Sequence, residues 1–278
     1  ALSQYGHVRN QFAVGMDMPM PAYQLLSRTL TKNAHDFVTG KVDEALAGTC
    51  RDASTARMLM RSGDNLIGSM VAVAMLQGTA QLFTDMLATL PADHVLPANC
   101  MQAFAPPVQE ELSVCNTMRG EYRFMTGGMS RSMQNERDKS WLRAVNYWLV
   151  YNQEKTEAGS AETFARWCSK DVASMLRDDI AIRPALLPVT ESTPWSMKCV
   201  DNATGCILTN IAAPAYSDYQ LRLQDSGARL RLAGALLWLR EQANDSVSMP
   251  QVLTTIPEKY ANKRRNLRMS DDGKSLVI

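Results

Sequence analysis

The chain has 278 residues, with 29 basic and 28 acidic side chains, so its formal net charge is +1. This balance lacks the basic excess that marks non-specific nucleic-acid binding, and we expect no nucleic-acid partner. The composition, 46% hydrophobic and 21% charged, excludes a disordered, collagen-like or low-complexity chain and indicates a folded protein with a sizeable core.

The N-terminal part of the chain is predicted to form helices separated by glycine. Hydrophobic spacing predicts a helix over Ala22–Ala47 that ends at Gly48. A second helix is expected to begin near Asp52 or Ser54 and to end at Gly63.

The next predicted helix, Asn65–Leu90, is the most apolar one; Asp64 caps it and Pro91 ends it. Its first 20 residues carry no charge, so a membrane span has to be considered. Polar residues and two glycines interrupt the stretch, whereas a lipid-facing helix would be nearly continuous in large apolar residues. We therefore predict a central buried helix.

The rest of the chain alternates further helices with proline-rich connections. The predicted helices are Glu110–Met118, Ser140–Tyr151, Ala161–Ile180 and Tyr216–Asn244. In the second of these, Trp141, Val145, Trp148 and Leu149 share one face. We also predict a small hairpin over 197–209, and two short strands, within Asn266–Met269 and Ser275–Ile278, around a turn.

Together these elements predict a mainly α fold, either an irregular multi-helix bundle or stacked helical hairpins, with a small β-hairpin element near the C-terminus. A change in composition divides the chain into a helical domain, 1–184, and a region, 185–278, packed on it. That second region comprises a loop and hairpin, a long helix and a β-turn segment. One continuous domain fits the same pattern.

The cysteines bear on the compartment. There are six, an even number that permits three disulfides, namely Cys50, Cys100, Cys115, Cys168, Cys199 and Cys206. Turn-forming residues between Cys199 and Cys206 favour a disulfide there. Six buried, reduced thiols in a cytosolic protein are the alternative. We favour disulfides and hence an extracytoplasmic compartment.

The other two pairings rest on weaker arguments. Cys100 and Cys115 flank Pro106-Pro107, a chain reversal that can bring them together. Cys50 and Cys168 then remain as the third pair by elimination.

No motif for a metal, a cofactor or a catalytic nucleophile is present. The three histidines are isolated in the sequence, and the glycine-rich phosphate-binding and dinucleotide-binding patterns are absent, so we expect neither metal nor cofactor. Three charged segments are interpreted as solvated surface: the acid pairs Glu110-Glu111 and Asp178-Asp179, and the basic run Lys263-Arg264-Arg265. Met16-x-Met18-x-Met20 is interpreted as an adaptable apolar segment.

Glu121 is the acidic residue most suited to an interior position. It lies between Arg119 and Arg123, and we predict a buried polar network in which Glu121 meets Arg57 or Arg61 near the polar residue Asp64. A structural ion pair is favoured over a catalytic role.

Three segments together resemble a family of mainly helical bacterial envelope proteins, many of them secreted proteins or lipoproteins. The segments are Asp64–Ala74, Arg119–Arg123 and Ala228–Trp238. The resemblance implies a helical architecture and an envelope location, and it brings no established activity. Where the family has a His-Gly-Arg-Tyr-Pro-type segment, this chain has Asp245–Pro250, so no ligand role is carried over.

These observations lead to a first hypothesis, a non-enzymatic, extracytoplasmic protein-binding protein of the periplasm or cell envelope. In one version it is an immunity protein that inhibits a secreted toxin or enzyme. Because the sequence begins at Ala1 without a leader, we expect membrane contact only through a removed N-terminal anchor. The alternatives are a hydrolase that uses Glu121 as acid or base, and a structural envelope lipoprotein.

Overall fold

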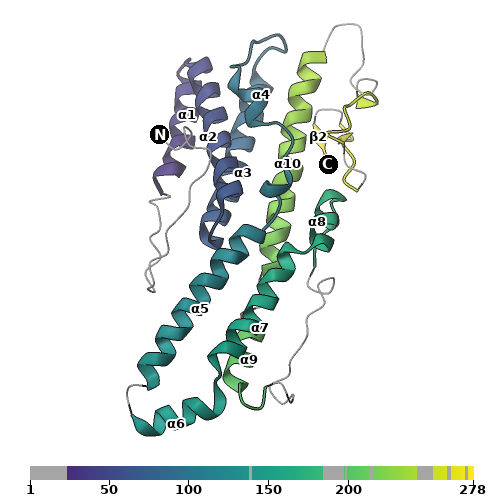
Figure 1. The fold of residues 1–278 in the computed structure, drawn as a ribbon. Coiled ribbons are helices and arrows are strands. Elements are labelled where there is room, and N and C mark those ends of the chain that lie inside the picture. Colours follow the sequence, from purple (N-terminus) through teal and green to yellow (C-terminus); the bar gives the residue numbers. More distant parts are fainter. Residues whose placement is uncertain are drawn as a thin grey trace.

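A computed structural model (Figure 1) describes residues 24–137, 140–183, 197, 199–212, 216–242, 253–261, 264–272 and 275–278. It confirms the mainly α fold. The small β element near the C-terminus is also confirmed, since β1 (Arg268–Met269) pairs with β2 (Leu276–Val277) in an antiparallel sheet.

The first two predicted helices correspond to α1 (Gln24–Val38) and α2 (Val42–Ser62), which pack against each other, but the break between them lies at 39–41 and the second predicted helix is the C-terminal part of α2. Gly40 ends α1 in a left-handed conformation, with φ at +88°, which glycine adopts without strain. The prediction that Gly48 ends a helix is wrong. Gly48 lies inside α2, and a Cβ there would lie 2.4 Å from Asn33 Oδ1, so its role is to let α1 approach closely.

The apolar helix is α3 (Leu66–Thr89), and its N-cap is Asn65, not Asp64 as predicted: Asn65 Oδ1 accepts a hydrogen bond from the Gly68 amide at 2.6 Å. Among the described residues, α3 is the one helix long and apolar enough to cross a membrane. Half of its most apolar stretch is buried within the protein, and it packs against α2 and α10 (Ser217–Gln242). This packing makes α3 the central helix of the core.

We call α1 to α4 together with α10 the head. Its short helices are α4 (Asn99–Ala103) and the 3₁₀ helix η2 (Gln109–Glu111). Phe83 of α3 and Phe104 after α4 are both fully buried and stack with ring centroids 4.2 Å apart. The head therefore holds a close-packed apolar core.

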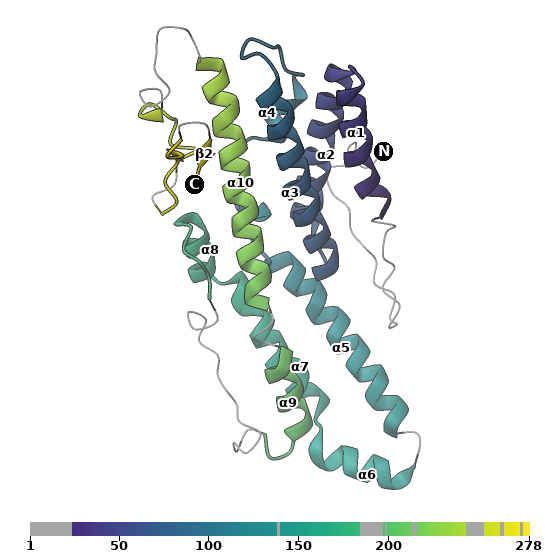
Figure 2. The ribbon, with the colours of Figure 1, turned by 180° about the vertical axis from the view of Figure 1, so that it is seen from behind.

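We call the projection from the head the arm. Its helices are α5 (Cys115–Arg137), α6 (Trp141–Val150), α7 (Gln153–Ala165) and α9 (Ala203–Ala212). Both views show α5 leading away from the head, α6 lying across the far end, and α7 leading back (Figures 1 and 2). The 3₁₀ helix η3 (Arg166–Cys168) and α8 (Lys170–Arg177) follow α7.

Two further predictions are corrected here. The hairpin predicted over 197–209 is wrong, because residues 203–212 form α9 and pack against α7. The helix predicted over Ala161–Ile180 is divided by η3 and by the capping residue Ser169. Met16, Met18 and Met20 lie outside the described residues, as does the predicted boundary between 184 and 185.

Candidate functional site

All six cysteines are paired, and two of the pairings differ from those predicted. The disulfides are Cys50–Cys100, Cys115–Cys168 and Cys199–Cys206. The predicted Cys199–Cys206 bridge is confirmed, whereas Cys100–Cys115 and Cys50–Cys168 are wrong. Helix packing decides the partners, since α2 lies against α4 and α5 lies near η3. Three disulfides are consistent with an oxidising, extracytoplasmic environment.

A buried ion pair replaces the predicted network around Glu121. Arg57 donates to both carboxylate oxygens of Glu111, at 3.0 and 2.8 Å, and Arg61 Nε lies 3.7 Å from the same carboxylate. The remaining Arg57 donors reach the backbone carbonyls of Gln102, Ala103, Ala105 and Pro106. Arg57 thus fastens the segment after α4 onto α2, which is a structural role.

Two acids interpreted as solvated are buried instead. Glu111 is fully buried in the pair just described. Asp179 is 5% exposed, and its carboxylate lies 3.1 Å from Arg265 Nε and 3.7 Å from Arg231 Nη1. Arg265, predicted to belong to a solvated basic rim, therefore fixes the C-terminal segment to α10 and the turn after α8. These ion pairs therefore hold charged groups that were predicted to face solvent.

Glu121 lies at the junction of arm and head. Its Oε1 accepts a hydrogen bond from the Leu66 amide at 2.7 Å, at the first turn of α3. Close to it, a Cβ on Gly120 would lie 1.5 Å from the Asp64 carbonyl oxygen. The structure thus brings Glu121 and Asp64 together, as predicted, but places Arg57 and Arg61 with Glu111.

The chemistry at Glu121 is that of a helix cap. Burial raises the pKa of the Glu121 carboxyl, and the Leu66 amide lowers that pKa by a smaller amount. Burial, and next the Glu121 charge, raise the pKa of Tyr216 to about 12. Asn65 and Glu121 together satisfy amides that the start of α3 leaves free.

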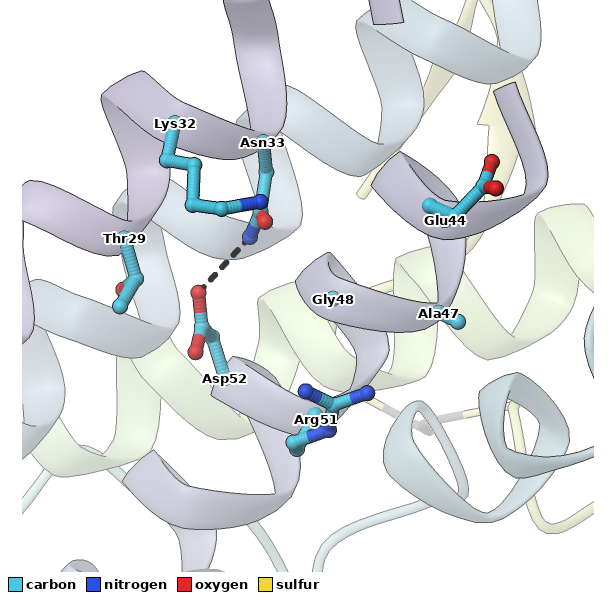
Figure 3. Close-up of a pocket in the computed structure, with 8 residues that line it drawn as sticks. All are labelled: Thr29, Lys32, Asn33, Glu44, Ala47, Gly48, Arg51 and Asp52. Carbon is cyan, nitrogen blue, oxygen red and sulfur yellow. Dashed lines mark hydrogen bonds between the residues drawn. The ribbon is translucent and has the colours of Figure 1, made fainter. Parts of the chain in front are cut away.

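One cavity, of about 330 Å³, lies between α1 and α2 (Figure 3). Asn33 Nδ2 donates to Asp52 Oδ2 at 2.9 Å on its inner side. Burial raises the pKa of Asp52, and hydrogen bonds from Thr29 and Asn33 lower it. Lys32, which also lines the cavity, forms an ion pair with Asp36. The cavity has two acidic and two basic residues on its wall and no net preference for a charged ligand.

A larger cavity, of about 790 Å³, lies beside the connection between α3 and α4. Arg240 of α10 lines it and donates to the carbonyls of Leu87 and Pro91, which closes the C-terminal end of α3. His94 Nε2 lies 3.3 Å from Asp43 Oδ1. The polar groups here hold the connection in place.

Within the part of the chain that the structure describes, no cluster of three or more His, Cys, Asp or Glu could hold a metal ion.

The inside of the arm differs from that of the head, because polar contacts join its helices. Asn202 Oδ1 accepts from the Asn152 amide at 2.8 Å and from Thr156 Oγ1 at 2.9 Å. Gln153 Nε2 donates to Ser130 Oγ at 2.9 Å, which connects α7 to α5. Hydrogen bonds and the Cys199–Cys206 disulfide therefore hold the arm together with one aromatic contact, Tyr122 of α5 against Phe164 of α7, with ring centroids 6.2 Å apart.

The large apolar side chains of the arm point outward at its end. Five of the fourteen large hydrophobic residues exposed in the described chain belong to the ten-residue helix α6. We call them the apolar face of α6: Trp141, Leu142, Val145, Trp148 and Leu149. They cover a continuous stripe of roughly 120° around the helix. The two tryptophans are 73% and 77% exposed.

This face is the strongest candidate for a functional site. The periodicity of the sequence predicts that four of its residues share one side of a helix, but it does not predict that this side is uncovered. The exposed parts amount to roughly 600 Å² of apolar surface, the upper end for the largest patch on an ordinary monomer. An exposed patch of this size is typical of an interaction surface.

Comparisons with known proteins found no matching family model, no matching curated protein and no matching solved structure.

Proposed function

We propose that the protein is a non-enzymatic binding protein of an extracytoplasmic compartment, and that the apolar face of α6 is its binding surface. The observation that carries this proposal is the exposure of Trp141 and Trp148, with three exposed aliphatic neighbours, on α6. This helix lies across the far end of the arm (Figure 1). Tryptophan supplies a large contact area at a small entropic cost and is enriched at binding hot spots.

The construction of the molecule supports this division of roles. The head is closed by a buried core, the Cys50–Cys100 disulfide and the Arg57–Glu111 pair, so it gives the arm a rigid base. The Cys115–Cys168 disulfide ties the start of α5 to the end of η3 at that base. A rigid base restricts the orientations of the arm, which lowers the entropic cost of binding.

The hydrogen bonding of Glu121, the candidate catalytic acid, supports a role without catalysis. Oε1 of Glu121 accepts the hydrogen bond of the Leu66 amide, which gives this carboxylate a structural task. A general acid or base needs a substrate within hydrogen-bond reach. The geometry therefore favours binding over hydrolysis.

Site-specific crosslinking in cells tests the proposal. A photoreactive amino acid replaces Val145, at the centre of the apolar face, and in a matched protein it replaces Arg123, which is exposed on α5 of the same arm. We expect adducts, with protein or with lipid, from position 145 and not from position 123. Equal adduct formation at both positions, or none at 145, would contradict the proposal.

A further inference from the structure

We propose that the partner of the apolar face of α6 is a membrane surface, in which α6 lies flat in the headgroup region with Trp141 and Trp148 as its anchors. This inference rests on the proposed function and specifies the partner of the same surface. It adds a membrane contact that belongs to the folded chain itself.

The position of α6 is the first argument. Both ribbon views show α6 crossing the end of the arm, so its outer side is the outermost part of the molecule there (Figures 1 and 2). Its contacts in the described chain include α5 and α9, which lie on its inner side. A helix across a protruding end can meet a plane along its whole length of about 15 Å. A protein partner would instead have to supply a matching concave groove.

The residues of the face are the second argument. Its described outward side chains are tryptophan, leucine and valine, and no charged residue is among them. Trp141 begins the helix and Trp148 lies near its end, so an indole stands near each end of the stripe. Tryptophan is enriched at membrane–water interfaces, because its ring is apolar and its N–H can bond to the polar headgroups. Interfacial helices combine such residues with leucine on one face.

The helix α9, which contacts α6, also has an exposed apolar residue. Ile207 of α9 is 43% exposed. The described side chains of the face carry no charge, so apolar contact supplies the binding. Binding should therefore depend only weakly on salt.

The compartment is the third argument. Three disulfides indicate an oxidising space outside the cytoplasm, and such a space is bounded by a membrane. A helix that is already folded does not incur the cost of ordering its backbone when it enters the interface.

Vesicle flotation of the purified full chain tests the inference. The probes are vesicles of phosphatidylcholine alone and of phosphatidylcholine with phosphatidylglycerol. We expect binding to both and a loss of about tenfold or more in the double variant Trp141→Ser/Trp148→Ser, since each buried tryptophan contributes a large apolar area. Val38→Ser, at an equally exposed apolar residue of the head, is the matched control and should bind like the wild type. Unfolding curves must show that both variants are folded.

Three results would overturn the inference. The first is equal flotation of the double variant and the wild type, and the second is no flotation of the wild type with either vesicle. The third is a wild-type dimer without lipid that becomes monomeric in the double variant, because a second copy then covers the face. A protein adduct from position 145 without vesicle binding would reject the membrane and leave the proposed function standing.

Discussion

The head and the arm bury their side chains in opposite ways. In the head, apolar residues from α2, α3 and α10 pack together, among them Leu76, Phe83 and Leu237. In the arm, none of the described side chains of α5 from Glu121 to Asn135 is buried, and five large apolar side chains of α6 are exposed. Both regions nevertheless consist mainly of α-helices.

This difference shows that an amphipathic sequence pattern predicts a helix but not what covers its apolar side. In the head the apolar faces of α2, α3 and α10 cover one another. At the end of the arm the described chain supplies no cover, and the hydrogen bonds of Asn202 and Ser130 hold the helices instead. We infer that the head supplies most of the stability and the arm most of the binding.

The largest effect should come from breaking the buried ion pair of the head. Arg57→Ala leaves the buried Glu111 carboxylate without its main partner, and we expect a loss of about 3–5 kcal/mol in the free energy of unfolding. Arg51→Ala, at an exposed position of the same helix, should change it by no more than about 0.5 kcal/mol. Urea unfolding measures both, and similar losses in the two variants would contradict the role assigned to Arg57.

The disulfides compare the two regions directly. Replacing Cys50 and Cys100 by alanine removes a link between residues 50 positions apart, and we expect a loss of about 2–4 kcal/mol. The Cys199–Cys206 link spans only 7 positions, so its removal should cost less and should act mainly on α9. Hydrogen exchange locates the effects. Faster exchange of head amides after loss of the Cys199–Cys206 disulfide would contradict the separation of head and arm.

Two glycines of α5 should respond with opposite signs. Gly120→Ala places a Cβ against the Asp64 carbonyl, where backbone must move, and we expect a loss of about 1–3 kcal/mol. Gly127 has nothing within 4 Å of an added Cβ, so Gly127→Ala should stabilise the helix by about 0.5–1 kcal/mol. Circular dichroism during urea unfolding measures both. Equal effects would mean that the junction is not close-packed.

The smallest effect concerns Glu121. Because its pKa is raised in the folded protein, the fold binds the proton more tightly than the unfolded chain does. Stability from this group is therefore full below the ordinary carboxyl pKa and falls as pH rises through the raised value. Glu121→Gln keeps an oxygen for the Leu66 amide, so at about pH 7 it should be neutral or slightly stabilising. Marked destabilisation at neutral pH would contradict this account.

Much of the fold was predictable from local pattern. The apolar spacing of α3 and α10 predicts both helices, and the turn around Asp271 predicts the closing strands. The failures have a shared cause: they depend on contacts between distant residues. Glu111 resembles a solvated acid until Arg57, 54 positions away, is placed beside it. Gly48 resembles a helix terminator until Asn33 is seen to occupy the space that a side chain would fill.

The same limit applies to the candidate site. The sequence predicts the shared face of Trp141, Val145, Trp148 and Leu149, because that face follows from helical spacing. It cannot predict that the face is outward, since that depends on how α5 and α7 place α6 at the end of the arm.

Oxidative footprinting of the tryptophans tests the central claim most directly. Purified protein and protein in the intact cells that produce it are oxidised under the same conditions. Mass spectrometry reports Trp141 and Trp148, with the buried Trp167 as internal control. We predict strong oxidation of Trp141 and Trp148 in the purified protein and protection of both in the cells. Protection of Trp141 and Trp148 in the purified protein, or equal oxidation in both settings, would contradict the claim that a partner covers the apolar face of α6.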